Sequence, residues 1–120
     1  MRDKIANVEF DERDGIVIAA FDGEIDSSNA GELRLALAER LPSTASGLVL
    51  DLTAVNYLDS SGIQLLFDLG RRVAARRQSI RLVVPDGAPM RRVLELCAVE
   101  SVAPMHPDLE AALSAQAEAF

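Results

Sequence analysis

Short apolar segments of strand length alternate with segments whose apolar residues recur at helical spacing, and this alternation constrains the fold most. Strands are expected at residues 5–10, 16–21, 48–52 and 80–84, with a short edge strand within 101–105. Helices are expected after the later strands, with apolar stripes formed by Leu33, Leu37 and Leu41, by Ile63, Leu66 and Val73, and by Met90, Val93, Leu94 and Cys97. A last helix should start near His106, capped by that residue or by Asp108. Because strands joined through a helix are usually parallel, this order predicts one α/β domain over residues 1–120.

The composition fits a globular protein of the cytoplasm. A chain of 120 residues is long enough to bury a core, and its 49% hydrophobic and 26% charged residues exclude a disordered chain. No apolar run approaches the ~20 residues of a membrane span, and the first residues lack the apolar core of a signal peptide. The single cysteine agrees with a reducing compartment. The formal net charge of −7 disfavours nucleic acid as a partner, because phosphate backbones would be repelled.

The residues that usually carry catalysis are not grouped in this sequence. His106 is the only histidine, and the chain around Ser60 lacks the first glycine of a G-x-S-x-G elbow. With one histidine and one cysteine, no metal-ligand spacing occurs, and Cys97 is expected to be a buried structural thiol. Asp51 follows a buried strand as a receiver-type phosphoacceptor would, but Lys4 is the only lysine and precedes it. No phosphate-binding glycine loop occurs either, so we expect no enzyme, no cofactor and no metal.

The tripeptide Asp-Ser-Ser occurs twice, at residues 26–28 and 59–61, each time before an expected helix. At the first copy, Asp26 or one of the serines should cap the helix, with Glu32 reaching back to complete a capping box. At the second copy Asp59 or Ser60 should be the cap, but Gly62 follows, and glycine early in a helix costs ~1 kcal/mol against alanine. We therefore expect Gly62 to leave space through which another molecule approaches the serine hydroxyls.

Three segments of the chain resemble one known family. Residues 23–37 ("GEIDSSNAGELRLAL"), 47–66 ("GLVLDLTAVNYLDSSGIQLL") and 91–102 ("RRVLELCAVESV") are similar to the STAS domain, and more narrowly to bacterial anti-sigma factor antagonists. The resemblance covers nearly the whole chain in the right order. It implies a small mixed β-sheet with helices packed mainly on one face.

The resemblance also implies a function. Ser60 matches the serine that a partner phosphorylates in this family, while Asp59, Ser61 and Gly62 match the rest of the motif, and Asp26 matches an acidic residue near the site. By resemblance, the unphosphorylated protein binds an anti-sigma factor that is also a serine kinase, and so releases a sigma factor. A serine phosphatase restores the active form. The choice of Ser60 over Ser61 rests on the resemblance alone, because both hydroxyls lie near one helix start.

Other members of the broader family leave two alternatives open: a soluble subunit of a lipid-transport ABC system, and a scaffold component of stress signalling. The chain also departs from the family at two turns. Ala98 stands where many members have glycine after the third helix, and "RRQS" at residues 76–79 stands where many have glycine before a strand. Both departures should strain a tight turn without affecting the switch.

Overall fold

The chain folds around one mixed β-sheet. The computed structural model describes residues 3–5 and 7–118. In this part of the chain six strands lie in sequence order: β1 (Asp3–Ile5), β2 (Val8–Arg13), β3 (Ile16–Ile25), β4 (Gly47–Leu58), β5 (Ser79–Val83) and β6 (Met105–His106). The pairs β1–β2 and β2–β3 are antiparallel, whereas β3, β4, β5 and β6 are mutually parallel neighbours. The expected mixed α/β sheet is confirmed.

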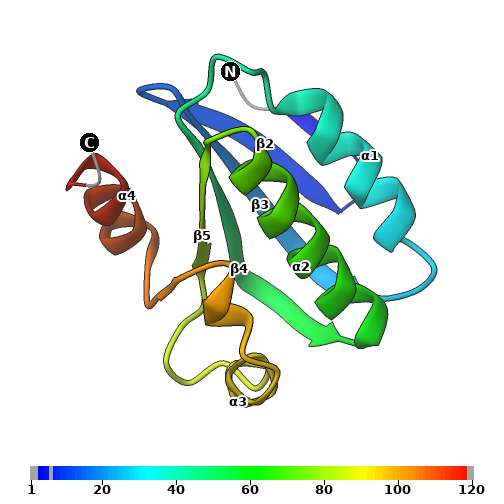
Figure 1. Cartoon of the computed structure of the whole chain (residues 1–120). Coiled ribbons are helices and arrows are strands. Elements are labelled where there is room, and N and C mark those ends of the chain that lie inside the picture. The colour runs from blue at the N-terminus through cyan, green and yellow to red at the C-terminus, as the bar shows by residue number, and fades with distance from the viewer. Residues whose placement is uncertain (1–2, 6, 119–120) are drawn as a thin grey trace.

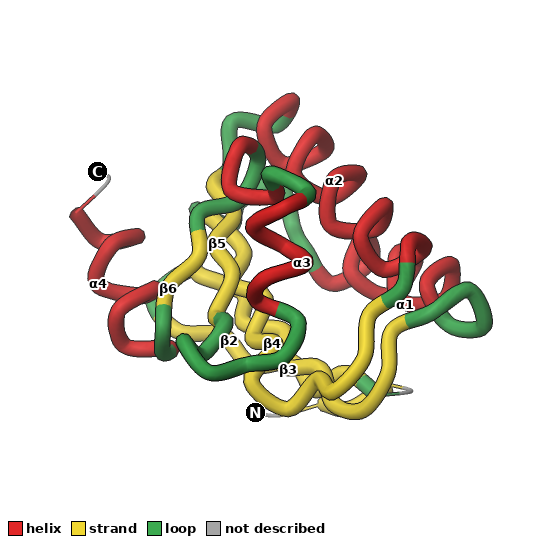
Figure 2. The backbone as a smooth tube through the Cα atoms, turned by 90° about the horizontal axis from the view of Figure 1, so that it is seen from below, coloured by secondary structure: helices red, strands yellow, loops and turns green. Residues whose placement is uncertain are grey.

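Most helices cover one face of this sheet. The described residues form α1 (Ala30–Arg40), α2 (Ser60–Ala75), α3 (Arg91–Leu96) and α4 (Leu109–Glu118), with a short 3₁₀ turn at Val99–Ser101. Figure 1 shows α1 and α2 side by side across the sheet, with α4 on the opposite side. Seen from below, α3 lies beside the sheet near α2, again away from α4 (Figure 2). No helix in the described residues combines the length and apolarity needed to cross a lipid bilayer.

Two apolar layers follow from the period-two alternation of the strands. The larger core, under α1 and α2, receives Val17, Ala19 and Phe21 of β3, and the smaller core, under α4, receives Ile16 and Ile18. The central strand β4 divides its residues in the same way. Helix α2 buries its apolar face in the larger core, at Leu65, Leu66, Leu69 and Val73. The expected apolar stripe is thus buried at Leu66 and Val73, in the core that β4 also lines.

The first expected strand, residues 5–10, is divided in the structure. β1 ends at Ile5 and β2 begins at Val8, and Ala6 lies outside the described residues. β2 then continues to Arg13, beyond the expected end at residue 10, and the turn before β3 consists of Asp14 and Gly15, whose φ angles are 53° and 82°. A two-residue connection with positive φ at both positions is the tight hairpin turn that Asp-Gly favours.

The expectation for Cys97 is wrong, because its side chain is exposed. The sequence predicted one helical stripe that would bury it with Met90, Val93 and Leu94. In the structure α3 ends at Leu96, and Val93 is 45% exposed. A helix of six residues makes fewer than two turns, so its register on the core is set by one anchor, Leu94, and not by a long stripe.

Both departures from the family occur at left-handed backbone positions. Arg77, after α2, has φ 58°, and Ala98, after α3, has φ 57°. Left-handed backbone costs a residue with a Cβ roughly 1–2 kcal/mol, which glycine avoids. The expected strain in these two turns is confirmed.

Candidate functional site

The two Asp-Ser-Ser copies meet because β3 and β4 are parallel neighbours. Ile25, the last residue of β3, is paired in register with Leu58, the last residue of β4. The two Asp-Ser-Ser tripeptides, which directly follow these strands, therefore lie at the same edge of the sheet. The backbone N–H of Asp59 donates to the carbonyl of Ile25 at 3.2 Å, which ties the second copy to the first.

Asp59 caps α2. Its backbone is extended (φ −98°, ψ −170°), and its Oδ1 accepts from the backbone N–H groups of Ser61 at 2.8 Å and Gly62 at 3.2 Å. This confirms one of the two expected caps. The carboxylate of Asp59 occupies these two N–H donors, so they are not free to bind a phosphate.

Asp26 organises a turn and does not cap a helix. Its Oδ1 accepts from the backbone N–H of Ser28 at 2.9 Å and from the Ser28 hydroxyl at 2.5 Å. The Ser28 hydroxyl, followed by the Ser28 N–H, holds the pKa of Asp26 below its ordinary value, so this carboxylate is ionised near neutral pH.

Helix α1 begins later than expected, at Ala30. Its N-cap residue is Asn29, whose side chain makes no capping hydrogen bond. The Asn29 amide instead donates to the carbonyl of Glu24 at 2.8 Å, and its Oδ1 accepts from the N–H of Asp26 at 3.0 Å. The expected capping box with Glu32 is therefore wrong, because the Asn29 side chain is used to close the preceding turn.

The expectation that Gly62 leaves space for another molecule to approach the serine hydroxyls is wrong. The residue is buried, and a Cβ placed on it would lie 2.9 Å from Cγ of Leu58 and 3.0 Å from the carbonyl oxygen of Ile25. The missing side chain is needed by the protein itself, because α2 begins pressed against the ends of β3 and β4. Gly62 therefore supports the site from below and is not part of its surface.

The two serines of the second copy face different hollows. Ser60 is exposed and lines a hollow of about 580 Å³, whereas Ser61 is half-buried and lines one of about 250 Å³. The larger, which we call the α2–α3 hollow, is formed by Leu58, Asp59, Ser60, Ile63, Gln64, Phe67, Val93 and Cys97. The smaller, the α1–α2 hollow, is formed by Ser27, Ala30, Gly31, Arg34, Ser61 and Gln64. Ser60 and Ser61 therefore differ in exposure, and the sequence alone did not reveal this difference.

The α2–α3 hollow is a largely apolar surface around one hydroxyl. One of its lining residues, Val93 on α3, is a large apolar side chain that is 45% exposed. Sequence reasoning missed Val93 and Cys97 as parts of this site. Their positions on a short helix gave no signal, although Phe67, four residues after Ile63, did extend the apolar face of α2 beyond the core.

The described residues that line the α2–α3 hollow include an exposed serine but no histidine or lysine. His106 lies on β6, where its ring nitrogen is 3.2 Å from Nη1 of Arg81, and does not line the Ser60 hollow. Among the described residues, no group of three histidine, cysteine or acidic side chains could hold a metal ion. An accessible serine hydroxyl beside an apolar surface is suited to modification and to binding.

Comparison with known proteins places this arrangement in a family. A family model described as "STAS domain" matches residues 7–112. The chain is 30% identical to the anti-sigma-F factor antagonist RsfA of Mycobacterium tuberculosis, over 85% of this chain and 80% of that one. It is 29% identical to RsfB of the same organism, over 86% and 83%. Among solved structures, an anti-sigma factor antagonist from Mycobacterium paratuberculosis superposes with a TM-score of 0.80 at 28% identity, covering 90% of this chain and 91% of that one.

Proposed function

We propose that the chain, which belongs to the STAS domain family, is an anti-sigma factor antagonist that is switched by phosphorylation of Ser60. The unphosphorylated protein binds an anti-sigma factor and so releases a sigma factor. The anti-sigma factor is itself the serine kinase, and a serine phosphatase reverses the modification. This exchange takes place in the cytoplasm, and no catalytic step is assigned to this chain.

The observation that carries the proposal is the exposed Ser60 hydroxyl at the rim of the α2–α3 hollow. A kinase needs a serine that is accessible at the surface of its substrate. Ser60 is exposed, whereas Ser61 is half-buried. A binding partner needs accessible apolar area, which Val93 and Phe67 provide on either side of the hollow. Both requirements are met at one place.

The physical basis of the switch is charge on an apolar surface. A phosphoserine adds about −1.5 to −2 charges at neutral pH. The N–H groups of Ser61 and Gly62 already bind Asp59, so the phosphate would stay in the hollow, where a partner would have to bury it. Burial of an unpaired charge is very costly, and each ~1.4 kcal/mol lost weakens binding tenfold. Asp59, at the same rim, adds to the repulsion.

The related proteins do not favour the other two functions considered. The curated relatives named above are anti-sigma factor antagonists, and none is named as a subunit of an ABC system or as a scaffold. Asp26, Asp59, Ser60 and Ser61 remain the proposed contact residues, with Gly62 as their structural support.

The test is phosphorylation and binding with purified proteins. Each anti-sigma serine kinase encoded by the source genome is incubated with this protein and ATP, and the phosphate is mapped by tandem mass spectrometry. We expect one phosphate, on Ser60. Ser60→Ala should abolish labelling while calorimetry shows unchanged affinity, whereas Ser60→Asp should weaken binding at least tenfold. Ser61→Ala is the matched control and should still be labelled.

Two results would contradict the proposal. Phosphate on Ser61, Ser27 or Ser28 would move the switch to another hydroxyl. Full affinity of the Ser60→Asp protein would show that charge at this position does not control binding.

A further inference from the structure

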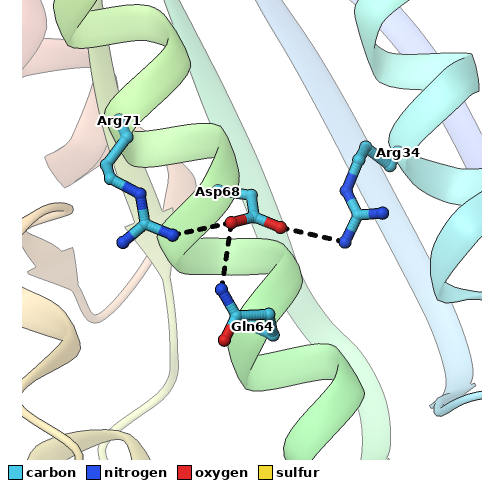
Figure 3. A network of polar contacts seen from close by, with 4 residues as sticks. All are labelled: Arg34, Gln64, Asp68 and Arg71. Carbon is cyan, nitrogen blue, oxygen red and sulfur yellow. Dashed lines mark hydrogen bonds and ion pairs between the residues drawn. The ribbon is translucent and has the colours of Figure 1, made fainter.

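Two arginines share the carboxylate of Asp68 on α2, and one of them, Arg34, joins α1 to α2 (Figure 3). Nη2 of Arg34, on α1, is 3.0 Å from Oδ2 of Asp68 on α2, and Nη2 of Arg71 is 2.7 Å from Oδ1 of the same carboxylate. The Gln64 amide also donates to Oδ1, at 3.0 Å. Hydrogen bonds from Gln64 and Arg71 hold the pKa of Asp68 below its ordinary value, so the carboxylate is ionised. Two guanidinium groups on one carboxylate leave a local excess of one positive charge.

Of these three charged groups, the Arg34 guanidinium is the one that lies at the α1–α2 hollow. Arg34 lines the hollow together with the hydroxyl-bearing residues Ser27 and Ser61, whereas Arg71 does not. The side chain of Arg34 is 43% exposed, yet its Nε is buried and has no hydrogen-bond partner in the structure. The position of a Cβ on Gly31 has no other atom within 4 Å, so the first turn of α1 leaves the hollow open. The hollow therefore presents donors and a cation on an otherwise acidic protein.

The α1–α2 hollow is continuous with the proposed switch site. Gln64 lines both hollows, and Ser60 and Ser61 are adjacent residues that line one each. A protein that covers Ser60 and extends past Gln64 would reach the α1–α2 hollow. The charges on the two sides differ in sign, since Asp59 lines the first hollow and Arg34 the second.

We propose that the α1–α2 hollow receives an acidic side chain, aspartate or glutamate, of the same partner protein that covers Ser60, and that Arg34 is a specificity-determining residue for that partner. The inference rests on the proposed function. A planar guanidinium binds carboxylate in a fork geometry, and serine hydroxyls supply further donors. With a net charge of −7, most of this protein repels an acidic side chain, so the hollow selects partners that carry one at the matching position.

The test compares two arginines that share the same ion partner. Arg34→Gln should weaken binding to the anti-sigma factor at least tenfold, and should reduce the dependence of affinity on salt concentration. Arg71→Gln removes an equivalent ion pair to Asp68 outside the hollow, and should change affinity less than twofold. Unfolding in urea is measured for both proteins, because a purely structural role of Arg34 would lower stability without lowering the affinity of the folded protein.

A second variant tests the hollow without changing charge. Gly31→Gln should fold, since nothing lies where its Cβ would be, but its side chain should fill the hollow and weaken binding. Equal affinity of the wild-type, Arg34→Gln and Gly31→Gln proteins would overturn the inference. If Ser60→Asp still weakens binding in that case, the proposed function stands without it. If the Arg34 effect is found while Ser60→Asp binds at full strength, the switch fails and the hollow remains a binding site.

Discussion

The same tripeptide begins two different structures at one edge of the sheet. At residues 26–28, Asp-Ser-Ser forms a turn, and α1 starts only at Ala30. At residues 59–61, Asp-Ser-Ser is the helix start itself, with Asp59 as cap and Ser60 as the first helical residue. The strands that lead into them, β3 and β4, are parallel neighbours that end in register. Neither the tripeptide nor the preceding strand therefore determines the outcome.

The difference comes from the residues that follow. After the first copy, Asn29 directs its amide back to the carbonyl of Glu24, which completes a turn before the helix can begin. After the second, Gly62 allows the helix backbone to approach the carbonyl of Ile25 directly. A helix that starts without a turn places its first side chain, Ser60, at the surface. The contrast teaches that one closely packed glycine allows the second helix to start directly at the strand end, whereas the serines of the first copy are exposed on a turn.

The glycine that follows each copy should give the largest contrast. Gly62→Ala puts a Cβ against Leu58 and the Ile25 carbonyl, and should cost about 1–3 kcal/mol of unfolding free energy, as overpacked cores do. Gly31→Ala meets no atom and should stabilise α1 by about 0.5–1 kcal/mol. Urea unfolding followed by circular dichroism measures both values. Equal effects of the two substitutions would remove Gly62 from its supporting role.

The carboxylates should differ by less. Asp59→Ala removes the cap that satisfies two N–H groups of α2 and should cost about 1 kcal/mol. Asp26→Ala opens a surface turn that does not start the helix, and should cost less than Asp59→Ala. Thermal and urea unfolding of the two variants provide the comparison. A larger loss for Asp26→Ala would mean that the first turn, and not the α2 cap, holds this edge together.

The smallest expected effect is a change in titration. Ser28→Ala removes the hydroxyl that contributes most to the lowered pKa of Asp26, so that pKa should rise toward the ordinary value of an aspartate. The contribution of Asp26 to stability is present above about pH 4 and is lost as pH falls through its folded pKa. Ser28→Ala should make this acid-dependent loss smaller. Carboxyl signals in an NMR titration give the pKa, with Ser61→Ala as the control that leaves it unchanged.

Sequence reasoning identified the elements better than their contacts. Leu66 and the β4 residues were placed correctly because long periodic segments determine which face is buried. Cys97 was misplaced because α3 is too short for a stripe to fix its orientation. The role of Gly62 depends on how close Leu58 comes from the end of β4, and a distance between segments leaves no local pattern.

At the candidate site, too, the sequence identified a motif but not the contacts between segments. The motif at residues 59–62 indicated, through its resemblance to a family, where we propose that the switch lies. It did not separate Ser60 from Ser61, because that choice depends on the rotation of α2 about its own axis on the sheet. Arg34 gave no signal either, since its importance arises only when α1 lies beside α2 and both helices share Asp68.

The left-handed turns at Arg77 and Ala98 lower the stability of the folded protein, and stability limits which further substitutions a protein can accept during evolution. Glycine at either position would relieve the strain without altering a hydrogen bond made by a side chain at the switch. Stability gained in this way would let the binding surfaces accept substitutions that the present chain could not tolerate. A lineage that acquired these two glycines first could therefore exchange one partner for another through intermediates that still fold.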